Sequence, residues 1–158
     1  MAFVYSCTPL THLTSSGTTN TELAAMAFRQ TARNCDINAF WCVGRGGGLT
    51  ALSGIGFRGK RWTTVGTSGN ALTPAPRRIG TTASTVVVDS NGTAITAGTV
   101  SGAVVLGFGC GAAGPGGWTA RDPDSAICLE AGSADEIAVY SVSTTISLTF
   151  DLSAEIAE

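Results

Sequence analysis

The sequence contains little histidine and lysine, with one residue of each, His12 and Lys60, among 158. Histidine is the usual general base of hydrolytic enzymes and a common zinc ligand, so its scarcity restricts both kinds of chemistry. A zinc site needs roughly three or four converging Cys or His ligands, whereas only Cys35 and Cys42 lie near one another in the sequence. Ser68 lacks the Gly-x-Ser-x-Gly spacing of a nucleophile elbow. The sequence therefore predicts no catalytic residues and no metal site.

Long apolar runs and a regular cysteine pattern are also absent. No stretch approaches the roughly eighteen apolar residues of a membrane-spanning helix, and the first residues lack the basic and apolar segments of a signal peptide. The five cysteines are an odd number and include no Cys-x-x-Cys pair. We therefore expect free, mostly buried thiols in a protein that is made in a reducing cytoplasm and binds no membrane.

Glycine, serine and threonine are abundant, with 57 residues together, whereas strong helix formers are scarce. The clearest pattern lies between residues 146 and 156, where every second residue is apolar, and a period of two is typical of a half-buried strand. Further strands are expected at residues 36–43, 61–65, 82–89, 100–108, 126–130 and 137–142. The sequence predicts an all-β fold, an antiparallel β-sandwich or jelly roll of about 8–10 short strands with an extended N-terminal arm.

The chain is long enough for one domain with its own core. Residues 1–22 include a polar, Ser/Thr-rich stretch and are interpreted as an N-terminal strand or extended arm, and residues 23–158 as a single β-sandwich domain. Residues 22–33 fit either a short helix or a strand, and the β character of the whole chain favours a strand. Within residues 36–43, Trp41 alternates with aliphatic residues, which predicts that it lies in the core.

Two glycine-rich segments resemble nucleotide-binding motifs. Residues 109–114 match the Gly-x-Gly-x-x-Gly pattern, but Pro115 and two glycines follow where that motif requires a helix to begin. Residues 54–60 nearly match a phosphate-binding loop, but Arg61 replaces the hydroxyl residue that would bind Mg²⁺. We expect no cofactor, and we interpret residues 109–114 as a tight β-loop whose glycines adopt positive φ angles.

Charge is distributed unevenly along the chain. Residues 1–80 hold eight basic and two acidic groups, a net charge of +6, and residues 81–158 hold one basic and nine acidic groups, a net charge of −8. The two halves can pair with each other within one chain, or complementary faces can meet in a partner or a second copy. Arginine outnumbers lysine eight to one, and interfaces favour arginine because it forms bidentate pairs and stacks on aromatic rings.

Because of this charge distribution and the excess of arginine, we predict that a set of charged residues, which we expect at the surface, contacts a partner. They are Arg29, Arg33, Arg45, Arg58, Lys60, Arg61, Arg77, Arg78, Asp122, Asp124, Asp135 and Glu136. The two aspartates that flank Pro123 fit a weak calcium site, but such a pattern is more often a solvated turn. The acidic C-terminal half argues against nucleic acid as a partner.

An ordered series of motifs is similar to a known group of proteins. The series consists of Gly48-Leu-Thr-Ala-Leu-Ser-Gly54, Thr73-Pro-Ala-Pro-Arg77, the glycine-rich segment 109–118, Pro123-Asp-Ser and Leu129-Glu, and it ends in a strand that closes on Glu158. It resembles small virion structural proteins of tailed bacteriophages, of the capsid decoration or cement type, over roughly residues 36–158. The resemblance implies a β-sandwich or jelly-roll body on the capsid surface, made in the host cytoplasm. It also implies the major capsid protein and copies of itself, in a homodimer or homotrimer, as partners, with no catalysis.

A second interpretation is a carbohydrate- or host-binding β-sandwich module of a tail or fibre. Aromatic faces stack on sugar rings, and Trp62 and Trp118 are the candidates for such a role. Trp118 ends the glycine-rich segment, where it more simply fills the space between two sheets.

Overall fold

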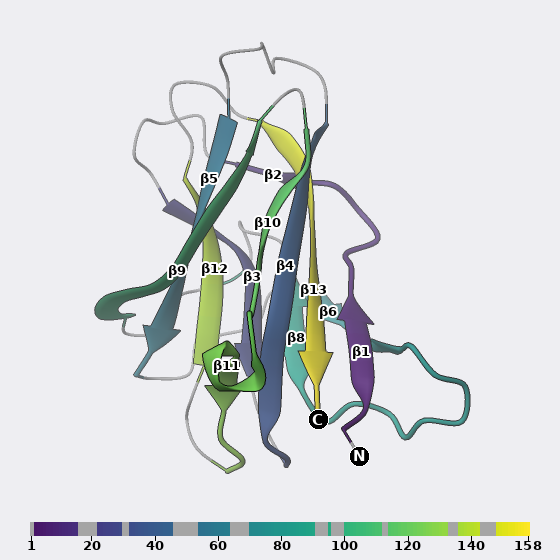
Figure 1. Cartoon of the computed structure of the whole chain (residues 1–158). Helices are drawn as coiled ribbons and strands as arrows, with labels where there is room; N and C mark the ends of the chain where they lie inside the picture. The colour runs from purple at the N-terminus through teal and green to yellow at the C-terminus, as the bar shows by residue number, and fades with distance from the viewer. Residues whose placement is uncertain are drawn as a thin grey trace.

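The computed structural model describes residues 2–15, 22–29, 32–45, 54–63, 70–90, 95, 100–111, 114–132, 136–142 and 148–158. Over these residues the chain forms two antiparallel β-sheets that pack face to face (Figure 1). Apart from one short 3-10 turn, η1 (Pro123–Ser125), all regular structure in the described residues is strand. The predicted all-β sandwich is therefore confirmed.

One sheet, which we name sheet A, runs in the order β10-β4-β13-β1-β7, and two further strands pair with its members. Its strands are β10 (Gly116–Thr119), β4 (Cys35–Arg45), β13 (Thr149–Ala157), β1 (Val4–Cys7) and β7 (Ala75–Pro76), with β11 (Ile127–Leu129) on β4 and β2 (Leu13–Thr14) on β13. Pro76 lies in the edge strand β7, as expected for a residue that cannot donate to a ladder.

The other sheet, sheet B, runs in the order β6-β8-β3-β12-β5-β9. Its strands are β6 (Asn70–Leu72), β8 (Val87–Ser90), β3 (Glu22–Arg29), β12 (Glu136–Val142), β5 (Gly54–Trp62) and β9 (Val100–Gly111). The strand interpretation of the ambiguous residues 22–33 is confirmed for Glu22–Arg29. The segment that nearly matches a phosphate-binding loop is part of β5, so its backbone N–H groups belong to a sheet and do not form an anion-binding loop.

The core lies between the sheets and contains a group of aromatic rings. In β13, Phe150, Leu152, Ala154 and Ile156 are buried while the residues between them are partly exposed, which confirms the alternation expected for this strand. Phe57 lies edge-on to Phe150, with ring centroids 5.1 Å apart. Aromatic pairs favour this geometry, and burial of such large apolar surfaces is the main stabilising contribution to a sandwich.

Strand β4 contains a bulge that changes which side chains face the core. Glu155 of β13 pairs with Ala39, but the next residue pairs with Ile37, so Asn38 has no partner in this ladder. An extra residue shifts the alternation of a strand by one position. Phe40 consequently turns inward, and Trp41 turns outward with 39% of its surface exposed. The prediction that Trp41 lies in the core was wrong, because the bulge interrupts the period of two on which it rested.

The N-terminal segment, residues 2–15, contributes two strands to sheet A. Strand β1 lies between β13 and β7, and β2 pairs with the start of β13. Phe3 and Glu158 exchange two backbone hydrogen bonds of 2.8 and 3.0 Å, so both ends of the chain lie side by side (Figure 1). Residues 2–15 therefore belong to the sandwich, whereas residues 16–21 of the expected arm lie outside the described residues.

The strand expected over residues 82–89 is shorter, because its first part binds a side chain. The backbone N–H groups of Thr85 and Val86 donate to the carboxylate of Glu158 at 2.9 and 3.0 Å, and the hydroxyl of Ser84 donates to it at 3.0 Å. These donors are then unavailable to a neighbouring strand, so pairing with β3 begins only at Val87.

The glycine-rich segment 109–117 connects the two sheets, passing from β9 in sheet B to β10 in sheet A. A Cβ atom on Gly116 would lie 1.6 Å from the carbonyl oxygen of Gly109, and a Cβ atom on Gly117 would lie 2.3 Å from that of Phe40. Positive φ angles occur at Gly80 and Gly132 but not at the described glycines of this segment. The prediction that the glycines of this segment adopt positive φ angles was therefore wrong for the described ones. Glycine is required at positions 116 and 117 because another backbone approaches too closely for a Cβ atom.

We predict that Gly116→Ala lowers the free energy of unfolding by about 3 kcal/mol or more, because β10 must move away from β9 to accommodate the methyl group. Gly114→Ala is the matched control, since a Cβ atom there meets nothing within 4 Å and its φ is not positive. Urea unfolding of the two variants measures the difference. Equal stability of both variants would contradict the close approach at Gly116.

Candidate functional site

Most of the predicted basic interface residues form ion pairs within the chain. Arg33 Nη1 lies 3.7 Å from Glu158 Oε2, and Arg77 Nη1 lies 2.6 Å from Glu155 Oε2. Further arginine pairs between the basic N-terminal half and the acidic C-terminal half, among the described residues, are Arg29 with Asp89 and Glu136, and Arg45 with Asp151. The two oppositely charged halves of the sequence therefore pair with each other in the folded chain, which was one of the two alternatives.

The Arg29 group is the most deeply buried of these clusters. Asp89 and Glu136 are 3% and 1% exposed, and Arg29 lies between them on the neighbouring strand β3. Removal of one member of a buried ion pair leaves an uncompensated charge, so such groups are tied to their places by the fold. Arg29 and Glu136 are therefore structural elements of sheet B in the single chain.

A second group of basic side chains surrounds Glu22 on sheet B. Arg58 Nη1 lies 3.3 Å from Glu22 Oε1, and Lys60 pairs with the other carboxylate oxygen while its ammonium lies 5.4 Å from the centre of the Tyr140 ring. Arg61 donates to the carbonyl oxygen of Cys128 at 2.8 Å. These contacts again lie within the chain.

The remaining predicted interface residues that the structure describes lie in turns or bends. Asp122 caps η1, accepting a hydrogen bond from the backbone N–H of Ser125 at 2.9 Å, and Asp124 is exposed in that turn. The solvated-turn interpretation of this pair is confirmed, because the carboxylate of Asp122 satisfies the turn. Arg78 is exposed after β7. Asp135 lies outside the described residues.

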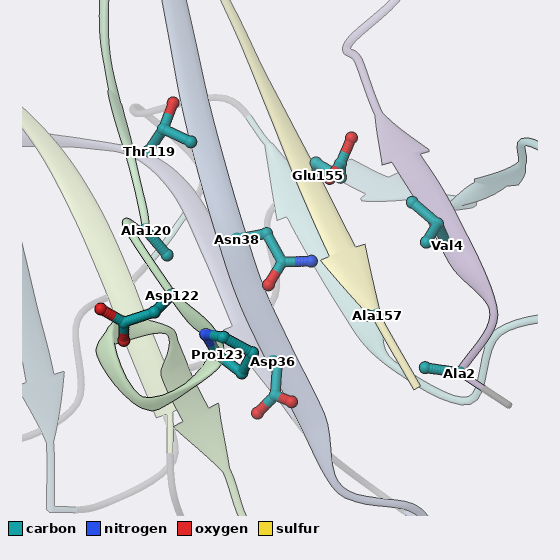
Figure 2. A pocket seen from close by; sticks show the side chains of 10 residues that line it. All are labelled: Ala2, Val4, Asp36, Asn38, Thr119, Ala120, Asp122, Pro123, Glu155 and Ala157. Carbon is teal, nitrogen blue, oxygen red and sulfur yellow. The ribbon is translucent and has the colours of Figure 1, made fainter.

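The outer face of sheet A is hollowed next to this capped turn. The hollow has a volume of about 480 Å³ and is lined by Ala2, Val4, Asp36, Asn38, Thr119, Ala120, Asp122, Pro123, Glu155 and Ala157. Asn38, the bulged residue, lies between the β10–η1 segment on one side and Glu155 and Val4 on the other (Figure 2). The backbone carbonyl oxygen of Asn38 accepts a hydrogen bond from the backbone N–H of Ala120 at 2.8 Å, which holds the β10–η1 segment next to β4.

Trp41 lies on the same outer face of sheet A, next to the hollow. Its cross-strand neighbours are Gly117 on β10 and Ser153 on β13. Two residues further along these strands are Thr119 and Glu155, which line the hollow. Two small flanking residues leave the indole open to solvent. Val43, two residues further along β4, is 41% exposed and extends the apolar surface. We name Trp41 and Val43 the outer apolar pair.

Neither of the other two tryptophans is exposed: Trp118 packs against the core between the sheets, and Trp62 lies in a separate apolar cluster with Ala138 and Tyr140. Trp62 is 2% exposed, and its indole N–H donates to the hydroxyl of Tyr140 at 2.6 Å. Trp118 packs against Phe40, with ring centroids 6.2 Å apart, as expected for a residue that fills the space between two sheets. Burial therefore excludes Trp62 as a surface on which a sugar ring could stack. Trp41, which the sequence predicted to lie in the core, is exposed. The bulge at Asn38 turns Trp41 outward, and the sequence carries no clear signal for that bulge.

Among the described residues, no three His, Cys, Asp or Glu side chains gather closely enough to hold a metal ion. Within the same ranges, no helix is long and apolar enough to cross a membrane. The five cysteines, all described, are free thiols, four of them buried, as predicted.

Comparisons with known proteins give little resemblance. No protein-family model matches the chain, and no curated protein matches it significantly. A solved structure, that of the infectious bursal disease virus Gx strain, aligns with 99% of this chain at 14% identity and a TM-score of 0.24. The chain spans 42% of the length of that viral chain. A TM-score this low establishes no shared fold, so the match carries no argument about this protein.

We predict a pH-dependent contribution from Asp151. Partial burial acts to raise the pKa of this carboxyl, but hydrogen bonds from His12 and Arg45 outweigh burial and leave the pKa lowered from its usual value of 3.8. A lowered pKa in the folded state means that the stabilisation is complete above the usual pKa and is lost as the pH falls through the folded-state pKa. Asp151→Asn should therefore cost up to about 1 kcal/mol near neutral pH, and this cost should shrink as the pH falls from about 7 to below 3.8.

Urea unfolding of the wild type and Asp151→Asn across this pH range measures that difference. Ser153→Ala, on the same face of β13, is the control and should show no such pH dependence. A difference that stays constant with pH would mean that the ion pairs of Asp151 do not stabilise the fold.

Proposed function

We propose that this chain is a non-enzymatic structural protein of a virion, a decoration protein that binds the outer capsid shell and stabilises contacts between capsomers. The ordered motif series from Gly48 to Glu158 supports the proposal, as does the two-sheet sandwich. Its partners would be the major capsid protein and further copies of the chain. A small rigid unit of this kind suits a symmetric lattice, because each contact is repeated many times.

The observation that carries this proposal is the outer apolar pair, Trp41 and Val43, which is exposed on the outer face of sheet A. Tryptophan is enriched in the centres of protein interfaces, where it buries a large area at little conformational cost. Gly117 and Ser153 on either side let a partner surface approach the indole closely. If Trp41 is buried only against assembled capsomers, its burial stabilises the assembled shell relative to separate capsomers.

The charged residues have a different role in this proposal from the one first predicted. Arg29, Arg33, Arg45 and Arg77 are engaged with carboxylates of their own chain, so a partner must compete with those contacts to reach them. Charged rims of an interface contribute little affinity but steer encounter and orientation. We therefore place the main contact at Trp41 and treat Arg45 and Arg77, whose carboxylate partners Asp151 and Glu155 lie on the same sheet, as its rim.

Density-gradient purification of virions from a host culture that expresses this chain tests the proposal. We expect the chain to migrate with the capsid band in a fixed ratio to the major capsid protein, and purified chain to rebind to shells that lack it. Trp41→Ala should weaken rebinding by about tenfold or more, since an interface centre has been truncated. Val104→Ala is the control, because Val104 is 51% exposed on β9, away from this face.

The thermal unfolding midpoint of each variant confirms that it is folded. A chain that stays at the top of the gradient contradicts the capsid proposal. Equal weakening by both substitutions contradicts the assignment of the contact to Trp41.

A second candidate function is binding of a neutral saccharide, as in a host-binding module of a tail or fibre. The specific observation in its favour is the hollow beside Trp41, where Asp36, Asn38 and Thr119 offer donors and acceptors next to an aromatic face. Sugar hydroxyls need such polar groups, and the apolar side of a pyranose ring stacks on an indole.

Binding to a glycan array tests this candidate. We expect retention of at least one saccharide, loss of at least about tenfold in affinity in Trp41→Ala, and partial retention in Trp41→Phe, which keeps an aromatic face. Asn38→Ala should also weaken binding, because it removes a polar group from the hollow. Retention that is unchanged in Trp41→Ala, or no retention of any saccharide, would reject this function.

A further inference from the structure

Two of the five thiols meet at the place where the sheets come together. Cys42 lies on β4 in sheet A and Cys110 on β9 in sheet B, and both face the core, with 0% and 7% exposure. They are distant in sequence and reach each other only through the fold. Strand β10 pairs with β4 and contacts β9 here, so it closes this side of the sandwich (Figure 1).

The two side chains are in direct contact. The thiols of Cys42 and Cys110 share a hydrogen bond, and backbone N–H groups donate to each sulfur, that of Gly116 to Cys42 and that of Gly44 to Cys110. The backbones are also close, since Gly116 is paired with Cys42 and a Cβ atom on Gly116 would lie 3.2 Å from the Cα of Cys110. The backbone of Gly116 therefore lies next to both cysteines.

The environment makes Cys110 unlike the other thiols. The hydrogen bond from Cys42 lowers the pKa of Cys110 despite its burial, and the N–H of Gly44 acts in the same direction. Burial raises the pKa of Cys7 to about 12 and also raises that of Cys35. A thiolate is the reactive form of cysteine, so Cys110 is the thiol poised to react and Cys42 is its neighbour.

We propose that Cys42 and Cys110 are a dithiol site that a hydroperoxide converts into a disulfide joining the two sheets. The thiolate of Cys110 attacks one oxygen of hydrogen peroxide, forms a sulfenic acid and releases hydroxide, which takes up the proton that the thiol lost. The sulfur of Cys42 then attacks the sulfur of Cys110 and displaces water. In total, two thiols and one peroxide give one disulfide and two water molecules; the protein loses two electrons and the peroxide gains them.

A small oxidant fits this site, because Cys110 is only 7% exposed and the space is too restricted for a bulky disulfide reagent. The disulfide would close a long loop and cross-link the sheets at the edge that β10 covers. Such a link restricts the unfolded chain, so it stabilises the folded protein. The inference concerns the chemistry of the single chain and does not depend on the proposed capsid function.

Treatment of the reduced protein with a stoichiometric amount of hydrogen peroxide tests the inference. We expect the intact mass to fall by two hydrogen atoms, a peptide map to show Cys42 linked to Cys110, and Tm to rise by roughly 10 °C. Cys42→Ala should instead leave a sulfenic acid on Cys110 that dimedone traps, whereas Cys7→Ala and Cys128→Ala should still form the link.

The peptide map of the wild type needs no variant to be folded, so it decides the matter by itself. A link between any other two cysteines, or five free thiols after treatment, would overturn the inference. A link that also forms in Cys42→Ala would show that Cys110 has a different partner and would overturn it as well.

Discussion

The close backbone contact of Gly109 with Gly116 is the constraint on which much of the structure depends. It lets β9, an edge strand of sheet B, meet β10, an edge strand of sheet A, with no side chain between them. Strand β10 is thereby held on β4, where Gly117 flanks Trp41. The same contact brings Cys110 against Cys42, since the main chains there have no room to separate. The closed edge of the sandwich and the dithiol site therefore share one physical cause.

The bulge at Asn38 is the second determinant, and it acts on function more than on stability. One unpaired residue reverses the facing of the rest of β4, so a core aromatic, Phe40, and an exposed one, Trp41, come from adjacent positions. The same residue forms the floor of the hollow. Bulges are frequent where a protein re-aims a side chain for binding, and both candidate functions use the surface that this one creates.

The charges of this protein are mostly used internally. Arginines from the first half of the sequence meet carboxylates from the second half because sequentially distant strands lie side by side, such as β3 with β8 and β12. Exposed pairs of this kind contribute little stability each, whereas the buried group around Arg29 fixes the register of sheet B. Because most of these charges are compensated within the chain, contact with a partner through the apolar side chain of Trp41 is favoured.

By itself the sequence determined the fold class, the strand of Phe150 to Ile156, the free thiols and the capped turn at Asp122. Those features depend on local rules: alternation with a period of two, an odd cysteine count, and an aspartate before a proline. The tertiary structure alone decided that Trp41 is exposed, that the glycines serve close contact in place of positive φ angles, and that Cys42 lies against Cys110. The physical reason is that each of these depends on a second strand: a bulge is defined by its partner's register, and a backbone contact by a segment distant in sequence.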